Sequence, residues 1–315
     1  MKKIILLTLL VLFALGIQAQ QLPLFTQYRE NATLINPAAM ESDFLASGEN
    51  ATFGVSLRSQ WTGVAGGPLT RVLRGSYLNL NGSGATLLVG GHILSDQTGP
   101  TSITGIYGRA GAVISGDPEY GGIALALSGG LVQYKLDGSL VELHDSGDIF
   151  DGQSYSQLHP DVGVGVFFYQ VVGDGNMFYG GISVPQVLGF DLSFKNDIGE
   201  FAIKRTQHFY GHVGLYKFFR NGESFVEPSL WVKYAAGAPI NADFNLRVQL
   251  PGNIWIGSGV STAKNFHLDL GFNLGDNVGF DNLIKLGYGF DHSFSPFGPF
   301  VGSTHELNVA ISFER

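Results

Sequence analysis

Apolar and polar residues alternate with a period of two in many segments of this chain. In 243–250 every second side chain is apolar, and 266–274, 284–291 and 306–314 repeat the pattern. An α-helix would scatter such side chains around its axis, whereas a β-strand places them on one face. The pattern therefore predicts a chain built mainly of two-faced β-strands.

Counting these segments between turn signals predicts about fourteen strands. We expect them at 51–61, 69–80, 83–95, 101–114, 118–133, 159–170, 175–184, 200–217, 222–235, 241–250, 253–262, 265–275, 280–292 and 303–313. Many of these spans reach the roughly 9–11 residues with which a tilted strand crosses a lipid bilayer.

The connections between these strands tend to alternate between long and short. The long connections are 62–68, 96–100, 134–158, 185–199, 236–240 and 293–302. The short ones contain pairs such as Asn81-Gly82 and Asn221-Gly222, which form tight hairpin turns. Long loops at one end and short turns at the other are typical of outer-membrane barrels. We therefore predict a transmembrane antiparallel β-barrel of about 14 strands over 51–315, with both termini at the periplasmic end.

The composition separates a membrane barrel from its main competitor, a soluble β-sandwich or barrel. Only 14% of the residues are charged, and the chain holds 45 glycines, 24 phenylalanines and 12 tyrosines, where about 25% charged residues is usual. A barrel in lipid tolerates this composition because its outer face is apolar. Polar residues on the other face, such as Asn245, Arg247, Asp269, Lys285 and Asn308, predict a polar lumen.

The N-terminus has the layout of a secretory signal peptide. Two lysines precede an apolar run over 4–17, and small residues offer cleavage near Ala19. We expect residues 1–19 to be removed; a retained anchor is the alternative. Residues 20–50 lack strand alternation, and we expect this N-terminal segment either in the barrel mouth or as a periplasmic contact.

We find no enzyme chemistry in the sequence. Cysteine is absent, and none of the common nucleophile, phosphate-binding or metal-protease motifs occurs. His267 and Asp269 share a strand face, but a lumenal hydrogen bond is a simpler explanation than part of a catalytic triad. The net charge of −8 argues against nucleic acid binding. We therefore predict no enzymatic activity and no cofactor.

One loop carries a cluster of acidic residues. Residues 136–155 contain Asp137, Glu142, Asp145, Asp148 and Asp151. Carboxylates close in sequence can bind calcium, although their spacing does not match an EF-hand. A solvated loop is the simpler interpretation, and calcium is the alternative.

Two motifs lie in the first quarter of the chain. The first motif holds Tyr28, Asn31, Asn36 and Pro37, and the second holds Arg58, Gln60, Trp61, Gly66, Pro68 and Thr70. They resemble the PorP/SprF family, membrane components of the type IX secretion and gliding machinery of Bacteroidota. Weaker matches are Asp161-x-Gly163-x-Gly165, Glu227-Pro228-Ser229, Gly287-Tyr288-x-Phe290-Asp291 and Gly302-Ser303-x-His305-Glu306. Met40-Glu41-Ser42 departs from the small residues that often follow the first motif in the family.

The resemblance implies a non-enzymatic protein that sits in outer-membrane lipid and contacts secretion and gliding machinery proteins. It would assist the export or surface anchoring of a secreted partner protein, with the ten residues of the two main motifs as the site. The second motif could equally close the barrel seam or fold into the lumen. A passive porin or solute channel is the main alternative function, and a lipid-modifying enzyme is a weaker one.

Overall fold

The computed structural model describes residues 25–81, 84–141, 153–189, 191–195, 200–219, 222, 224–275, 279–295 and 298–314. Its strands are β1 (Ala51–Ser59), β2 (Leu69–Leu78), β3 (Gly84–Thr98), β4 (Thr101–Ser115), β5 (Gly121–Asp137), β6 (Ser154–Val172), β7 (Asn176–Val184), β8 (Asp191–Lys195), β9 (Glu200–Lys204), β10 (His208–Phe219), β11 (Ser224–Ala235), β12 (Asn241–Gln249), β13 (Ile254–Ser261), β14 (Asn265–Leu274), β15 (Leu283–Ser293) and β16 (Thr304–Phe313). The short helices are α2 (Ala32–Ile35), α3 (Ser42–Ser47), η1 (Gly138–Leu140) and α4 (Gly298–Val301).

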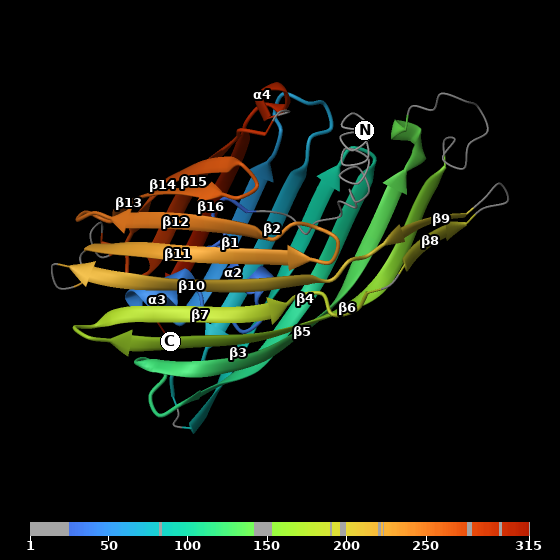
Figure 1. The fold of residues 1–315 in the computed structure, drawn as a ribbon. Helices are drawn as coiled ribbons and strands as arrows, with labels where there is room; N and C mark the ends of the chain where they lie inside the picture. Colours follow the sequence, from blue (N-terminus) through green and yellow to red (C-terminus); the bar gives the residue numbers. More distant parts are fainter. Residues whose placement is uncertain are drawn as a thin grey trace, which may run out of the picture.

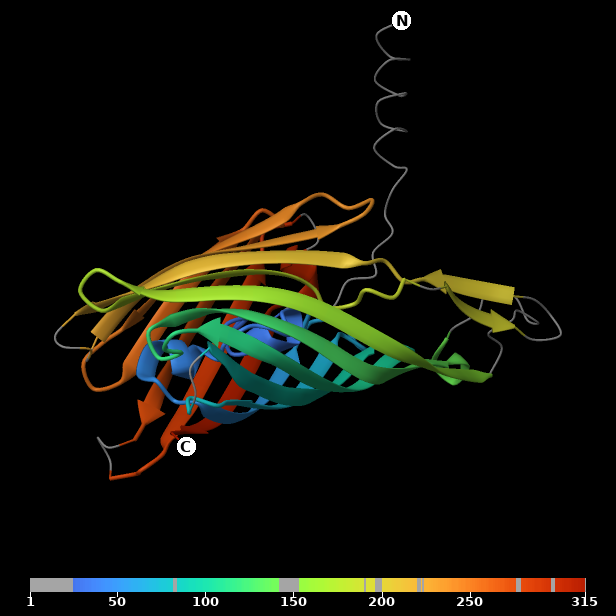
Figure 2. The same cartoon turned by 90° about the horizontal axis from the view of Figure 1, so that it is seen from below.

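Fourteen of the described strands form one closed barrel (Figures 1 and 2). Each strand pairs with its neighbours in antiparallel fashion, and β1 closes the ring by pairing with β16, Ala51 opposite Phe313. Closure leaves no sheet edge, so every wall strand can satisfy its backbone groups inside the wall. The predicted barrel of about fourteen strands is confirmed.

The alternation seen in the sequence becomes the two faces of this wall. On β1, Phe53, Val55 and Leu57 point outward and are 41–56% exposed, whereas Thr52 and Ser56, which alternate with them, are buried in the barrel. A wall with an apolar outer face and a polar inner face is what a lipid bilayer requires of a barrel. No helix in the described ranges is long and apolar enough to span a membrane.

A hairpin outside the barrel corrects one predicted element. The expected single strand over 200–217 is wrong, because β9 pairs with β8 in a separate two-stranded sheet and β10 enters the barrel only at His208. Between them, Arg205 is buried in an ion pair with Asp161 of β6 (2.5 Å). This long-range contact ends the strand where local alternation would continue it.

The connections define the two ends of the barrel. The links between β1 and β2, β5 and β6, β7 and β10, and β15 and β16 all lie at one end. We call this the outer end, because long loops of such barrels face outward, and the opposite end the inner end. At 15–19 residues, β3 to β6 are longer than a bilayer crossing needs.

Candidate functional site

The lumen of the barrel contains the chain's own N-terminal segment. Residues 25–48, which we call the lumen segment, include α2 and α3, and most of their side chains are buried. Figure 2 shows both helices enclosed by the strands. The segment begins near the outer end, where Thr26 meets Glu306, and reaches the inner end, where Asn50 donates to the Leu78 carbonyl.

The wall around this segment has two chemically different halves. We call β11, β12, β14 to β16, β1 and β2 the charged wall, since it contributes Arg58, Arg74, Glu227, Arg247, Asp269, Lys285 and Glu306 to the lumen. We call β3 to β7 and β10 the apolar wall, since it contributes Leu88, Val113, Ala124, Phe167, Tyr169, Met177 and Tyr216. Arg109 and Asp161 are the buried charged residues of the apolar wall.

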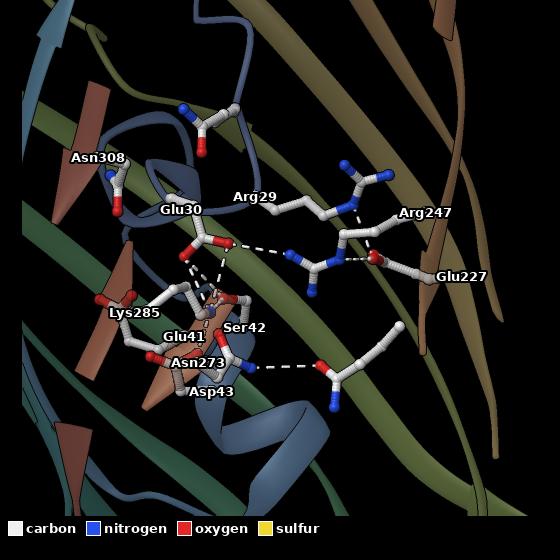
Figure 3. A network of polar contacts seen from close by, with 12 residues as sticks. Arg29, Glu30, Glu41, Ser42, Asp43, Glu227, Arg247, Asn273, Lys285 and Asn308 are labelled. Carbon is white, nitrogen blue, oxygen red and sulfur yellow. Dashed lines mark hydrogen bonds and ion pairs between the residues drawn. The ribbon is translucent and has the colours of Figure 1, made fainter. Parts of the chain in front are cut away.

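Glu30 is the centre of the contacts with the charged wall (Figure 3). Its carboxylate lies 3.1 Å from the Lys285 amine, 3.1 Å from the Arg247 guanidinium and 3.9 Å from that of Arg74. Burial alone would raise the pKa of Glu30, but the three cations outweigh it and lower the pKa to about 2. Glu30 is thus held ionised at neutral pH, and each of its cations has a counter-charge.

A second cluster anchors the two residues before Glu30. The Arg29 Nε atom lies 2.7 Å from a carboxylate oxygen of Glu227, which Arg247 also approaches at 3.2 Å. The hydroxyls of Tyr28 and Ser229 are 2.5 Å apart, and the Tyr28 ring stacks on Trp231 at 4.8 Å. Residues almost two hundred positions away in the sequence therefore fix the register of the lumen segment.

A third cluster, the outer latch, ties the beginning of the segment to the outer end of the wall. The Thr26 backbone N–H donates to Glu306 at 2.7 Å, and Asn31 donates to the same carboxylate. Arg58 pairs with Asp291 at 2.7 Å and with Glu306 at 3.2 Å, and it donates to the Thr26 hydroxyl. The latch (Thr26, Arg58, Asp291 and Glu306) joins β1, β15 and β16 to the segment.

The middle of the lumen segment turns toward the apolar wall. The Asn36 side chain donates to the Val166 carbonyl at 3.1 Å, and Arg109 donates to the Pro37 and Ala39 carbonyls, each at 2.8 Å. Asn36 can approach because Gly165 faces it, where an added Cβ would collide with the amide.

Beyond that turn the contacts are mainly apolar. Ala38, Ala39, Met40, Phe44 and Leu45 join one buried cluster with aromatic and aliphatic residues of the apolar wall. The Phe44 ring meets the Tyr169 ring edge to face at 5.6 Å. The opposite side of α3 faces the charged wall, where Asp43 pairs with Lys285 and Glu41 lies 2.9 Å from Arg74. Burial raises the pKa of Glu41, and Arg74 and Arg109 only partly oppose that effect.

The structure divides the ten predicted site residues into two groups. Tyr28, Asn31, Asn36 and Pro37 belong to the lumen segment, and Arg58 reaches it from the wall. Gln60, Trp61, Gly66 and Pro68 instead lie in the loop after β1, where the Gln60 N–H donates to the Pro68 carbonyl. Thr70 faces inward on β2 and donates to Asp96.

Sequence reasoning did not single out Glu30, the residue with the most charged contacts in the lumen. One signal was available, because Arg29, Glu30, Glu41 and Asp43 bring charge into a segment that has no strand pattern. The motifs built around Gly165, Glu227 and Asp291 all contribute to lumen contacts. His267 bonds to Asn245 and not to its neighbour Asp269.

No group of three or more potential metal ligands occurs in the part of the chain that the structure describes. Of the acids in the 136–155 loop, Asp137 is described, and it accepts hydrogen bonds from Ser139. Glu142, Asp145, Asp148 and Asp151 lie outside the described residues. A solvated loop there stays the prediction, with calcium as its alternative.

Comparisons with known proteins show the family of this chain and the fold that it shares with solved structures. Residues 17–311 match the family described as "Type IX secretion system membrane protein PorP/SprF". The translocator domain of autotransporter NalP from Neisseria meningitidis is similar in structure (TM-score 0.51, 11% identity, covering 92% of this chain and 96% of that one). So is the Pseudomonas putida toluene transporter TodX (0.50, 9%, 90% and 94%). At these identities the likeness concerns the fold alone. No curated protein matches the chain.

Proposed function

This chain belongs to the PorP/SprF family of type IX secretion system membrane proteins, and we propose that it is a plugged, non-enzymatic component of that machinery. In this proposal it resides in the outer membrane after signal peptide cleavage near Ala19. It contacts other secretion and gliding proteins and assists the export or surface anchoring of a secreted partner protein.

The observation that carries the proposal is the occupied lumen. The lumen segment contacts β1, β2, β6, β11, β12, β15 and β16 through hydrogen bonds or ion pairs. Removing one partner of a buried ion pair costs on the order of 3–5 kcal/mol, because the other charge is left without a counter-charge. Withdrawing the segment would leave the charges of the wall uncompensated in this way. A barrel filled in this way suits a scaffold or partner-binding protein better than a diffusion pore.

The motifs that identify the family also support this interpretation. They are spread over residues 28–306, yet each of the six contributes a residue that meets the lumen segment or the latch around it: Tyr28, Arg58, Gly165, Glu227, Asp291 and Glu306. Because the residues that mark the family hold the lumen segment in place, we infer that the filled lumen is part of the function of the family. The passive porin is the second candidate, because the barrel itself is large enough to enclose a folded segment.

Two measurements on the full-length protein test the proposal. The first is a cross-linked pull-down from the native outer membrane, followed by identification of the proteins recovered. We expect secretion or gliding subunits, or one abundant secreted protein. The second is ion conductance of the purified protein in a planar bilayer, which we expect to remain at the level of protein-free lipid. Steady conductance together with no companion proteins would favour the porin.

A further inference from the structure

The loops after β1 and β15 form one rigid structure at the outer end. The backbone N–H groups of Thr62 and Gly63 donate to the carbonyls of Ser303 and Val301, each at 3.0 Å. The two chains touch at Gly63 and Gly302, where a Cβ on Gly302 would meet the Gly63 backbone. We call this pair of loops, residues 60–68 and 298–303, the outer ledge.

The outer ledge presents large apolar side chains to its surroundings. Trp61 and Val64 are 40% and 43% exposed, and Phe300 is 80% exposed. Trp61 also has a φ of 58°, which is unfavourable for a bulky residue and persists only where the surroundings enforce it. The hydrogen-bonded backbone of the two loops thus carries an indole and a phenyl side chain on the outside of the protein.

The lipid-facing band of the barrel ends before the ledge begins. On the outer face of β1, the exposed and polar Ser59 follows Leu57 toward the outer end. On β2, the exposed Arg71, which pairs with Leu57, follows Leu73 in the same direction. Trp61 lies in the loop after β1, and Phe300 lies in α4, which Figure 1 shows at the outer end of the barrel. The bilayer core therefore does not account for their exposure.

The ledge also lacks charge. No Asp, Glu, Lys or Arg occurs in 59–69 or in 294–304, and the adjoining turn at 97–102 has none either. Phosphates of lipid headgroups are bound by arginine and lysine, so this surface is poorly suited to them. An uncharged aromatic surface on a rigid backbone has the composition of a protein-binding hot spot.

We propose that the outer ledge is a docking surface for an uncharged, apolar face of a secreted protein. The proposal rests on the proposed function, because only an export component meets such proteins at its outer end. Phenylalanine and tryptophan bury roughly 150–250 Å² each in an interface, so covering the ledge side chains would remove about 300 Å² from water. That is a substantial part of the roughly 800 Å² that each partner contributes to a stable interface.

The ledge is continuous with the outer latch inside the barrel. Arg58 lies two residues before Gln60 on β1, and Glu306 lies two residues after Thr304 on β16. A protein bound to the ledge therefore sits over the strand ends that hold Thr26.

The test uses photo-cross-linking of the full-length protein in its native outer membrane. Benzoylphenylalanine replaces Phe300 in one variant and Phe280, 48% exposed at the inner end, in a matched control. We expect position 300, and not position 280, to cross-link to an exported protein that is lost from the cell surface when this chain is deleted. Adding Trp61→Ser and Val64→Ser should lower that cross-link about tenfold, as expected when central hot-spot residues are removed.

Other outcomes overturn the proposal. Cross-links from position 300 only to lipid, only to a second copy of this chain, or to nothing would each show that no secreted protein docks there. Retention of the barrel's heat-modifiable mobility in gels confirms that the variants fold. If the pull-down still recovers secretion proteins while position 300 gives no cross-link, docking at the outer ledge is wrong and the proposed function stands. If both experiments fail, the proposed function falls as well.

Discussion

The charged wall and the apolar wall hold the same segment by different physical means. The charged wall contacts it through directional pairs, such as Glu30 with Lys285 and Arg29 with Glu227, which require specific partners at specific distances. The apolar wall holds Asn36 and Pro37 by hydrogen bonds, but around Phe44 and its neighbours it packs mainly by shape and volume. Ion pairs define one position of the segment, whereas apolar packing adds stability with less specificity.

This difference has a consequence for substitutions. Removing one partner of a buried ion pair leaves an uncompensated charge, whereas trimming an apolar side chain leaves a cavity that its surroundings can partly fill. Changes on the charged side should therefore cost more and tolerate fewer replacements than changes on the apolar side.

Deleting residues 25–48 removes both sets of contacts and should have the largest effect. The closed barrel retains its wall pairing, but the lumen loses the segment that fills it. We expect stable ion conductance in planar bilayers from the deletion variant and none from the full-length protein. A silent deletion variant with folded-barrel mobility would contradict the view that this segment closes the lumen.

Glu30→Gln removes the ion pairs of the lumen segment with the charged wall around Glu30 and leaves the apolar contacts in place. Lys285, Arg247 and Arg74 would then share the lumen without their common counter-charge. We expect a loss of about 3–5 kcal/mol in the free energy of unfolding, measured by urea titration in lipid vesicles with tryptophan fluorescence. Glu119→Gln, at an exposed turn of the inner end, is the matched control and should leave the midpoint unchanged.

Phe44→Ala tests the apolar side with a smaller expected loss. The substitution leaves a cavity beside Tyr169, and phenylalanine truncations in packed cores cost about 3–5 kcal/mol. We expect the lower end of that range, because the surrounding side chains can partly fill the cavity. Phe44→Leu should recover most of that loss in the same urea titration, because the site needs volume and not a specific partner. A loss as large for leucine as for alanine would mean that ring geometry matters here too.

Lowering the pH should change the stability of the protein less than any of these substitutions, until the pH is very low. The pKa of Glu30 is lowered from 4.5 to about 2, so its stabilising charge is present above pH 4.5 and is lost as the pH falls through 2. The pKa of Glu41 is raised by burial, so its protonation on acidification favours the folded state. We expect the urea midpoint to hold or rise from pH 7 to pH 4 and to fall below about pH 3.

Two variants show which carboxyl group causes each change of the urea midpoint with pH. Glu41→Gln should reduce any gain in the urea midpoint between pH 7 and pH 4, and Glu30→Gln should flatten the decline of the midpoint at lower pH. A steep loss of stability already at pH 5 in the unmodified protein would show that the charges around Glu30 do not hold its carboxylate ionised.

The sequence allowed a good prediction of the wall and a poor one of what fills it. Thirteen of the fourteen expected spans overlap a single barrel strand, because alternation is a local signal. The strand expected over 200–217 was divided by the Arg205–Asp161 pair, which joins residues far apart in the chain. The position of residues 20–50 was left open, and Glu30 was not named, because nothing near them in sequence identifies their partners.

By itself, the sequence determined that this chain forms a two-faced antiparallel wall with an apolar exterior, because side-chain alternation and turn residues act over a few positions. Only the tertiary structure decided that the lumen is filled, that its two halves differ, and that the loops at 60–68 and 298–303 join into one ledge. These features depend on residues up to about 280 positions apart, and barrel closure alone brings them into contact.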